Sequence, residues 1–240
     1  SQVLANVEAA WNDADCDSDG LNNEEEATGI DDPTTPIDPN GNTTDPQDPD
    51  TDGDGVTDGV EATDGTNPND PCDYIATSQV IANVEAGWST ADCDSDGLTN
   101  AEETTGIDDP TTPINPSGNI TDPMDPDTDG DGVTDGQEAT DSTNPNDLCD
   151  YEAASQVLAN VEAAWNDADC DSDGLNNEEE ATGIDDPTTP INPNGNITDA
   201  QDPDTDGDGV TDGVEATDGT NPNDPCDYCL LYTSDAADES

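Results

Sequence analysis

The chain has 240 residues, of which 63 are acidic, and it contains no Lys, Arg or His, so its formal charge is -63. This charge excludes nucleic acid as a direct partner, because phosphate repels it, and it disfavours anionic membrane surfaces. The absence of His and Lys also excludes the usual Ser/His, Cys/His and Lys nucleophilic sites.

Only 28% of the residues are hydrophobic and 3% are aromatic. Low hydrophobicity combined with extreme net charge is typical of disordered chains. Divalent cations would neutralise the carboxylates and stabilise a fold, so we expect folding to be linked to metal binding. No stretch approaches the ~20 apolar residues of a membrane span. The chain does not begin with Met and has no visible signal peptide, so we expect a mature product or a fragment.

A 77-residue repeat organises the sequence. Its copies are residues 1–77, 78–154 and 155–228, and the first and third differ at only three shared positions. A tail without the repeat covers 229–240. The tail resembles a translated sequencing adapter, so we expect an artefact. The alternative is a genuine C-terminal cap that carries a free Cys229.

Each copy opens with a short apolar segment. In the first copy Val3, Val7 and Trp11 fall at i, i+4 and i+8, which predicts a short helix; an irregular strand is the alternative. We expect Trp11 and its equivalents Trp88 and Trp165 to pack in the interior rather than to form a platform for sugar stacking.

The early loop follows this segment at residues 15–26, 92–103 and 169–180. It has the spacing of a calcium loop, with Asp at positions 1, 3 and 5, Gly at 6, a backbone carbonyl at 7, Asn at 9 and Glu at 12. A solvated acidic turn is the alternative. The predicted ligands are Asp15, Asp17, Asp19, Leu21, Asn23 and Glu26; Asp92, Asp94, Asp96, Leu98, Asn100 and Glu103; and Asp169, Asp171, Asp173, Leu175, Asn177 and Glu180.

A Pro-rich segment comes next, and its Pro density excludes a helix or a central strand. We expect extended, polyproline-like pieces joined by turns. Asn42, Asn119 and Asn196 each begin an Asn-X-Thr sequence in this segment, at the same place in every copy. These residues are predicted N-glycosylation sites.

The late loop, at residues 50–61, 127–138 and 204–215, matches the calcium pattern fully, with Asp also at position 9. The predicted ligands are Asp50, Asp52, Asp54, Val56, Asp58 and Glu61; Asp127, Asp129, Asp131, Val133, Asp135 and Glu138; and Asp204, Asp206, Asp208, Val210, Asp212 and Glu215.

The segments beside the late loop exclude a sensor EF-hand, which needs a helix on each side of its loop. Pro46 and Pro49 block a helix before the loop, and Gly65 and Pro68 stop one after about one or two turns. The same two residues argue against a dockerin, which needs a long helix after each loop. We therefore expect structural Ca²⁺, with at least two ions in each repeat.

At these residues the chain resembles bacterial thrombospondin type 3 repeats. The matching stretches are 48–59, 65–73 and 91–97, and the Pro-rich insertion departs from the compact pattern. The resemblance implies calcium-wrapped irregular coil in secreted or surface proteins, where such repeats serve as stalks and spacers.

Six of the seven cysteines occupy repeated positions, and two pairings fit the period. Cys16 can join Cys72 within a repeat, or the bonds can cross the junctions between repeats. We favour the junction bonds, which are Cys72–Cys93 and Cys149–Cys170. Cys16 and Cys226 would then bond a neighbouring repeat or another protomer. Paired cysteines, glycosylation sequences and calcium loops together indicate an extracellular or cell-surface location.

The sequence therefore predicts mostly irregular coil with short helices, in a calcium- and disulfide-stabilised tandem-repeat array that is solenoid-like or fibrous. The predicted function is a structural one, as a glycosylated extracellular filament or surface stalk. Its expected partners are copies of itself head-to-tail and covalent glycans, without nucleic acid or membrane insertion. The alternatives are a calcium-dependent adhesin or binding module and a carboxylate-based glycoside hydrolase. Because the carboxylates follow calcium spacing, we expect no enzymatic activity.

Overall fold

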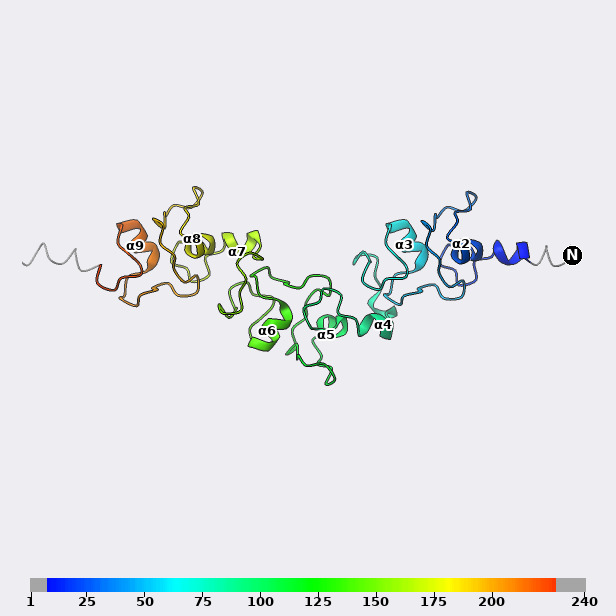
Figure 1. Ribbon diagram of the computed structural model, residues 1–240, viewed down its shortest axis with the longest axis horizontal. Coiled ribbons are helices and arrows are strands. Elements are labelled where there is room, and N and C mark those ends of the chain that lie inside the picture. The colour runs from blue at the N-terminus through cyan, green and yellow to red at the C-terminus, as the bar shows by residue number, and fades with distance from the viewer. Residues whose placement is uncertain (1–7, 228–240) are drawn as a thin grey trace, which may run out of the picture. The chain divides into compact units, whose positions relative to one another are not determined.

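The computed structural model describes residues 8–227, which form short helices joined by long irregular segments (Figure 1). Residues 8–12 are helical. The further helices are α2 (Asn23–Thr28), α3 (Asp58–Asp64), the 3₁₀ helix η1 (Ile81–Asn83), α4 (Ala86–Ser89), α5 (Asn100–Thr105), α6 (Asp135–Asp141), α7 (Ala163–Asp167), α8 (Asn177–Thr182) and α9 (Asp212–Asp218). Residues 8–227 contain no β-strand, so the prediction of irregular coil with short helices is confirmed. The predicted tail at 229–240 lies outside the described residues.

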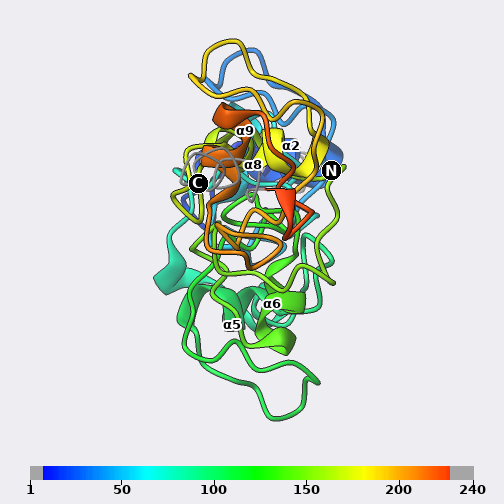
Figure 2. The same cartoon turned by 90° about the vertical axis from the view of Figure 1, so that its left-hand side faces the viewer.

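The chain divides into two compact units, Ser1–Pro126 and Asp127–Ser240. The first unit contains α2 to α5 and the second contains α6 to α9. Within each unit the labelled helices stay short and are surrounded by coil in both views (Figures 1 and 2). The boundary falls inside the second sequence repeat, between its early and late loops, and the division into three repeats stays a prediction from the sequence. No helix within residues 8–227 is long and apolar enough to cross a bilayer.

The helix that closes each early loop is fixed locally at both ends. In α2 the Asn22 side chain accepts a hydrogen bond from the Glu25 backbone N–H, and the Glu25 carboxylate accepts one from the Asn22 N–H. This reciprocal pair is a capping box. Gly29 ends the helix in the left-handed conformation, with φ 66°. The same box recurs in α5 and α8, which end at Gly106 and Gly183.

The helix that closes each late loop stops where the sequence predicted. α3 and α9 end at Gly65 and Gly219, whose φ angles are 82° and 77°. In α6 the equivalent residue is Ser142, which adopts the same left-handed conformation with φ 69°. The stop is therefore kept in all three copies, including the one that has no glycine there.

The prediction of a helix over the opening apolar segment is wrong for most of that segment in the second and third copies. α4 and α7 begin only at Ala86 and Ala163. In the second copy the N–H groups of Val80 and Glu85 donate to backbone carbonyls of the preceding late loop, at 2.9 and 2.7 Å. A continuous helix over this segment would use the Glu85 N–H for its own ladder, so the contact with the preceding loop replaces that helix.

Two of the three tryptophans are buried. Trp88 and Trp165 are each 1% exposed, and they meet Tyr74 and Tyr151 edge-on, with ring centroids 6.4 and 6.2 Å apart. These two residues pack in the interior as predicted. Trp11 differs, because it is 46% exposed.

Candidate metal centres

The late loop of the first repeat bends its backbone around its own carboxylates. Asp50 accepts hydrogen bonds from the N–H groups of Gly53 and Gly55, both at 2.9 Å. Asp54 accepts one from the N–H of Val56 at 2.7 Å. Gly53 and Gly55 have φ 76° and 89°, which glycine adopts without strain. As a result, Asp50, Asp52 and Asp54 each offer an oxygen, and these three atoms lie within 4.8 Å of one another.

Three other loops bring together their residues at positions 1, 3 and 5 in the same way. The groups are Asp15, Asp17 and Asp19; Asp92, Asp94 and Asp96; and Asp127, Asp129 and Asp131. In each case the oxygens again lie within 4.8 Å of one another. The predicted spacing therefore produces clustered carboxylates in both the early and the late loops.

The carboxylate at position 12 is buried without full hydrogen bonding. Glu61 is 0% exposed; its Oε1 accepts a hydrogen bond from the Thr66 hydroxyl at 3.4 Å, and its Oε2 has no hydrogen-bond partner. Asp52 and Asp54 each also keep one buried oxygen without such a partner. Burial of an uncompensated carboxylate is costly, and this sequence has no Lys, Arg or His to compensate it. The same feature occurs at Asp17, Glu26, Asp129, Asp131, Glu138, Asp171, Glu180, Asp206, Asp208 and Glu215.

These clusters fit calcium. Burial, followed by the charge of neighbouring carboxylates, raises the pKa of Glu61, Glu138 and Glu180 to about 9 and that of Glu26 to about 8. The same causes raise the pKa of Asp54 to about 7. A divalent cation that prefers several oxygen donors would offset both causes, and calcium has that preference. When bound, it would supply the positive charge that the sequence lacks.

Position 9 of the late loop connects the two loops of a repeat. Asp58 accepts hydrogen bonds from the Thr51 N–H and hydroxyl, at 2.9 and 2.7 Å. Asp58 also groups with Asp19 and Glu26, positions 5 and 12 of the early loop, within 4.8 Å. In addition, Asp19 accepts a hydrogen bond from the Gly59 N–H at 2.7 Å. The sequence assigned Asp58 only to its own loop, whereas the structure places it beside the early cluster.

The third repeat has the same connection. Asp212 accepts a hydrogen bond from the Thr205 hydroxyl at 2.7 Å, and the Gly213 N–H donates to Asp173. Burial first, and then carboxylates that include Asp173 and Asp212, raise the pKa of Glu180. In the first and third repeats, the late and early loops therefore meet at a shared group of carboxylates.

The asparagine at position 9 of the early loop has a packing role. The side-chain amides of Asn100 and Asn177 donate to the Sγ atoms of Cys93 and Cys170, at 3.1 and 3.2 Å, and accept from the N–H groups of the same cysteines. Asn23 donates to the Sγ atom of Cys16 in the same way, at 3.3 Å. The assignment of these three asparagines as metal ligands stays a prediction.

Sequence reasoning missed the threonines that hold the position-12 carboxylates. The Thr44 hydroxyl donates to Glu26 at 3.4 Å, and the Thr198 hydroxyl donates to Glu180 at 3.1 Å. Thr44 is also the third residue of the sequon at Asn42. The recurrence of this Thr every 77 residues was the available signal, and its contact with the loop gives that recurrence a structural reason.

The cysteines have the junction pairing. The two disulfides are Cys72–Cys93 and Cys149–Cys170, each with its Cα atoms 5.4 Å apart. The alternative bond between Cys16 and Cys72 is absent. Cys16 and Cys226 are exposed thiols. Disulfides of this kind are typical of proteins outside the reducing cytosol.

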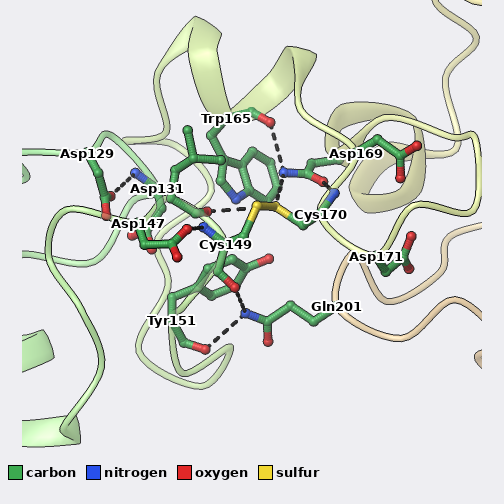
Figure 3. Close-up of a disulfide and its surroundings, with 12 residues drawn as sticks. Asp129, Asp131, Asp147, Cys149, Tyr151, Trp165, Asp169, Cys170, Asp171 and Gln201 are labelled. Atoms are coloured by element: carbon green, nitrogen blue, oxygen red, sulfur yellow. Dashed lines mark hydrogen bonds between the residues drawn. A yellow bond between two sulfur atoms is a disulfide. The ribbon is translucent and has the colours of Figure 1, made fainter.

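The second junction packs around its disulfide. Cys149 lies close to Trp165 and Tyr151 (Figure 3). The Gln201 side chain donates hydrogen bonds to the carbonyl oxygens of Cys149 and Tyr151, at 3.3 and 3.1 Å. Covalent, aromatic and polar contacts thus join the end of the second repeat to the third.

A comparison with protein families matches the bacterial TSP3 repeat at residues 50–71, 127–148 and 204–225, each of which contains a late loop. The comparison with curated proteins gave no match, and neither did that with solved structures. The bacterial TSP3 repeat is a non-catalytic, calcium-binding module. The predicted resemblance is confirmed, and this chain carries bacterial TSP3 repeats in three copies.

Proposed function

We propose that this chain is an extracellular structural protein whose calcium-bound repeats form a filament or a surface stalk. The observation that carries the proposal is the buried position-12 carboxylate with an unbonded oxygen, which recurs as Glu61, Glu138 and Glu215. Each belongs to a helix of seven residues that ends at a left-handed residue. A calcium sensor needs a pair of helices that open, so calcium bound here would hold the fold rather than switch it.

The extracellular assignment follows from redox state and calcium supply. The two disulfides require an oxidising compartment to persist. Extracellular calcium modules bind with dissociation constants of roughly 10⁻⁴–10⁻³ M, so they need calcium-rich surroundings. Two carboxylate clusters in the first repeat, at Asp15–Asp19 and Asp50–Asp54, are consistent with at least two ions in each repeat.

N-linked glycans at Asn42, Asn119 and Asn196 are part of the proposal. Ile120 and Ile197, which follow two of these asparagines, are each 59% exposed. A bulky, polar glycan on the neighbouring asparagine would cover this apolar surface. Mass spectrometry of peptides from the native protein would detect the glycan, and unmodified asparagine at all three positions would remove this part of the proposal.

A calcium-dependent binding module is the second candidate. Ile30, Ile107 and Ile184 occupy the same position in each repeat and are 69%, 72% and 68% exposed. Large exposed apolar side chains at a regular interval are a feature of contact surfaces. Calcium-dependent capture of a glycan or protein ligand by this chain, lost when these isoleucines are changed to Ser, would favour the module.

Chelation tests the structural proposal directly. We expect excess EDTA to abolish the circular dichroism of the short helices and to expose the chain to a protease that does not need Lys or Arg, with recovery on addition of calcium. Unchanged circular dichroism and unchanged proteolysis in EDTA would contradict a fold held by metal. Electron microscopy of the calcium-loaded native material then separates filaments of one repeating chain from stalks of a larger protein.

A further inference from the structure

The geometry points to a specific joint between two copies of this chain: the late loop 204–215 of one copy receives the opening segment of a second copy, and Cys226 of the first forms a disulfide with Cys16 of the second. This inference rests on the proposed structural array and names the surfaces through which copies would join. The same joint already occurs twice inside the chain, once in each compact unit.

In the first unit, the opening segment of the second repeat covers the preceding late loop. The N–H groups of Val80 and Glu85 donate to the carbonyl oxygens of Gly55 and Gly53, at 2.9 and 2.7 Å. The Gln79 side chain donates to the carbonyl oxygen of Asp54, which lies between these two glycines, at 2.7 Å. A Cβ added at Gly53 would lie 2.7 Å from the Cβ of Glu85, so the two backbones approach as closely as glycine permits.

The second unit repeats these contacts with the same atoms. The N–H groups of Val157 and Glu162 donate to the carbonyl oxygens of Gly132 and Gly130, at 2.9 and 2.8 Å. The Gln156 side chain again donates to the carbonyl between them, at 2.7 Å. Two independent occurrences show that this pairing belongs to the repeat and is not an accident of one junction.

The third late loop presents the same face uncovered. Among the described residues, none lies within 4 Å of a Cβ added at Gly207 or Gly209, the equivalents of the covered glycines. Both glycines are exposed, and Val210 is only half-buried. The equivalent Val56 and Val133 are 2% and 1% exposed. None of the described residues therefore covers, in the third loop, the face that the other two loops bury against an opening segment.

The opposite half of the joint is present at the start of the chain. Residues 1–8 have the same sequence as 155–162, the segment that covers the late loop in the second unit. Trp11 is 46% exposed, whereas Trp88 and Trp165, which follow the two covering segments, are each 1% exposed. Burial of such a side chain against a partner would remove a large apolar area from water.

The thiol of Cys16 has the surroundings of a bonded junction cysteine. Its Sγ accepts a hydrogen bond from Asn23 at 3.3 Å, as the bonded sulfur of Cys93 does from Asn100 at 3.1 Å.

The backbone at Cys226 likewise matches that of the other cysteine of a junction. Its N–H donates to Asp224 at 3.2 Å, as the N–H of bonded Cys72 does to Asp70 at 3.2 Å. Cys16 and Cys226 are both exposed. Both cysteines are thus exposed and have the local hydrogen bonds of bonded junction cysteines before the copies meet.

The bond forms by exchange with a small-molecule disulfide such as oxidised glutathione. The Cys16 thiolate of one copy attacks that disulfide, which gives a mixed disulfide and releases one thiol. The Cys226 thiolate of the other copy then attacks the Cys16 sulfur and releases the second thiol. The two protein thiols are oxidised, and one molecule of the reagent is reduced to two thiols.

Two variants with complementary cysteines test the joint. Both carry Cys229→Ser; one also carries Cys16→Ser and the other Cys226→Ser. In calcium with oxidised and reduced glutathione, we expect the mixture to form a disulfide dimer at about ten times the yield of either variant alone, because docking raises the effective concentration of the second thiol. Non-reducing gel electrophoresis and peptide mapping identify the bond as Cys16–Cys226.

A glycine substitution on the docking face tests the contact itself. Gly207 has φ 75°, a conformation that Asn tolerates, and Gly207→Asn would collide with Glu8 of the second copy as a Cβ at Gly53 collides with Glu85. We expect about a tenfold loss of the mixed dimer, since overpacked contacts are destabilising. The matched control is Gly219→Asn, which has φ 77° and equally open surroundings among the described residues.

The control position is informative because none of the described residues lies within 4 Å of a Cβ added at its internal equivalent, Gly65. Gly219→Asn should leave the dimer yield unchanged. Equal yields from Gly207→Asn and the parent, or homodimers as abundant as the mixed dimer, would overturn the inference. Circular dichroism in calcium and in EDTA is measured for every variant. If the two complementary cysteine variants fold with calcium but do not form the mixed dimer, the joint alone is refuted.

Discussion

The carboxylate at position 12 of the late loop offers the sharpest test of calcium as part of the fold. Glu138 is 0% exposed, and its Oε2 makes no hydrogen bond. Burial, and then the charges of Asp129, Asp131 and Asp135, raise its pKa to about 9. Glu138→Gln removes one negative charge and one ligand, so it should have opposite effects in the two states. The calcium-loaded chain should become less stable, and the fold of the chelated chain should become more stable.

The size of the effect follows from the linkage between binding and folding. With free calcium at about 100 times the dissociation constant, one site adds about 2.7 kcal/mol to the free energy of unfolding. Loss of an outer-shell partner already weakens metal sites by about 10- to 100-fold, so we take about 100-fold for the loss of a direct ligand. The site then contributes only about 0.4 kcal/mol. The calcium-loaded variant should therefore lose about 2 kcal/mol, or on the order of 8 °C in Tm.

Thermal unfolding followed by circular dichroism in calcium measures the first effect, and the helical signal that remains in EDTA measures the second. The matched control is Glu152→Gln, which makes the same chemical change at an exposed residue. The control should move Tm in calcium by less than about 2 °C and leave the signal in EDTA unchanged. A loss in calcium that the control reproduces would indicate a net-charge effect, and an unchanged Tm for Glu138→Gln in calcium would refute the assignment of this residue to the site.

Three further results are expected. Replacement of both Cys149 and Cys170 by Ser should lower the free energy of unfolding in calcium by about 3 kcal/mol in urea titration, because the bond closes a loop over a separation of 21 residues; a loss below about 1 kcal/mol would contradict this. In EDTA, the raised folded-state pKa values of Glu61, about 9, and Glu26, about 8, mean that the folded chain binds more protons than the unfolded one between about pH 4.5 and pH 9, so the helical circular dichroism that EDTA abolishes at neutral pH should return as pH falls through that range, and no return on acidification would refute the sign. Asp58→Asn should weaken calcium binding to the early loop as well as to its own loop, so equilibrium dialysis should show two weakened sites in the first repeat. If only one site is weakened, Asp58 serves its own loop alone.

The loops were predictable because their determinants are local. The carboxylates of Asp50, Asp52 and Asp54 converge through hydrogen bonds to N–H groups only two to five residues away, so the spacing alone specifies the turn. The stop at Gly65 is equally local, since the left-handed residue directly follows the helix. Sequence reasoning is strongest where the partner of a residue lies within the same turn.

The remaining features depend on partners that lie far away in the sequence. The Glu85 N–H donates to the carbonyl of Gly53, 32 residues earlier, and this contact replaces a bond of the helix that the apolar spacing favoured. Glu25 holds the Pro-rich segment by accepting hydrogen bonds from the Asp32 N–H and the Thr35 hydroxyl, although its place beside the loop ligands gave no hint of that role. Helical periodicity and ligand spacing contain no information on such contacts, so these residues were missed or misassigned.

The contact between the early and late loops has a consequence for how calcium stabilises a repeat. Asp19 and Glu26 of the early loop group with Asp58, and Asp19 also holds the N–H of Gly59 in the first turn of α3. The same helix carries Glu61, the last ligand of the late loop. An ion that orders the early carboxylates therefore also fixes the start of the helix that completes the late site. Because one helix serves both sites, filling either loop lowers the ordering cost of the other, and the two loops of the first repeat should bind calcium cooperatively as one unit.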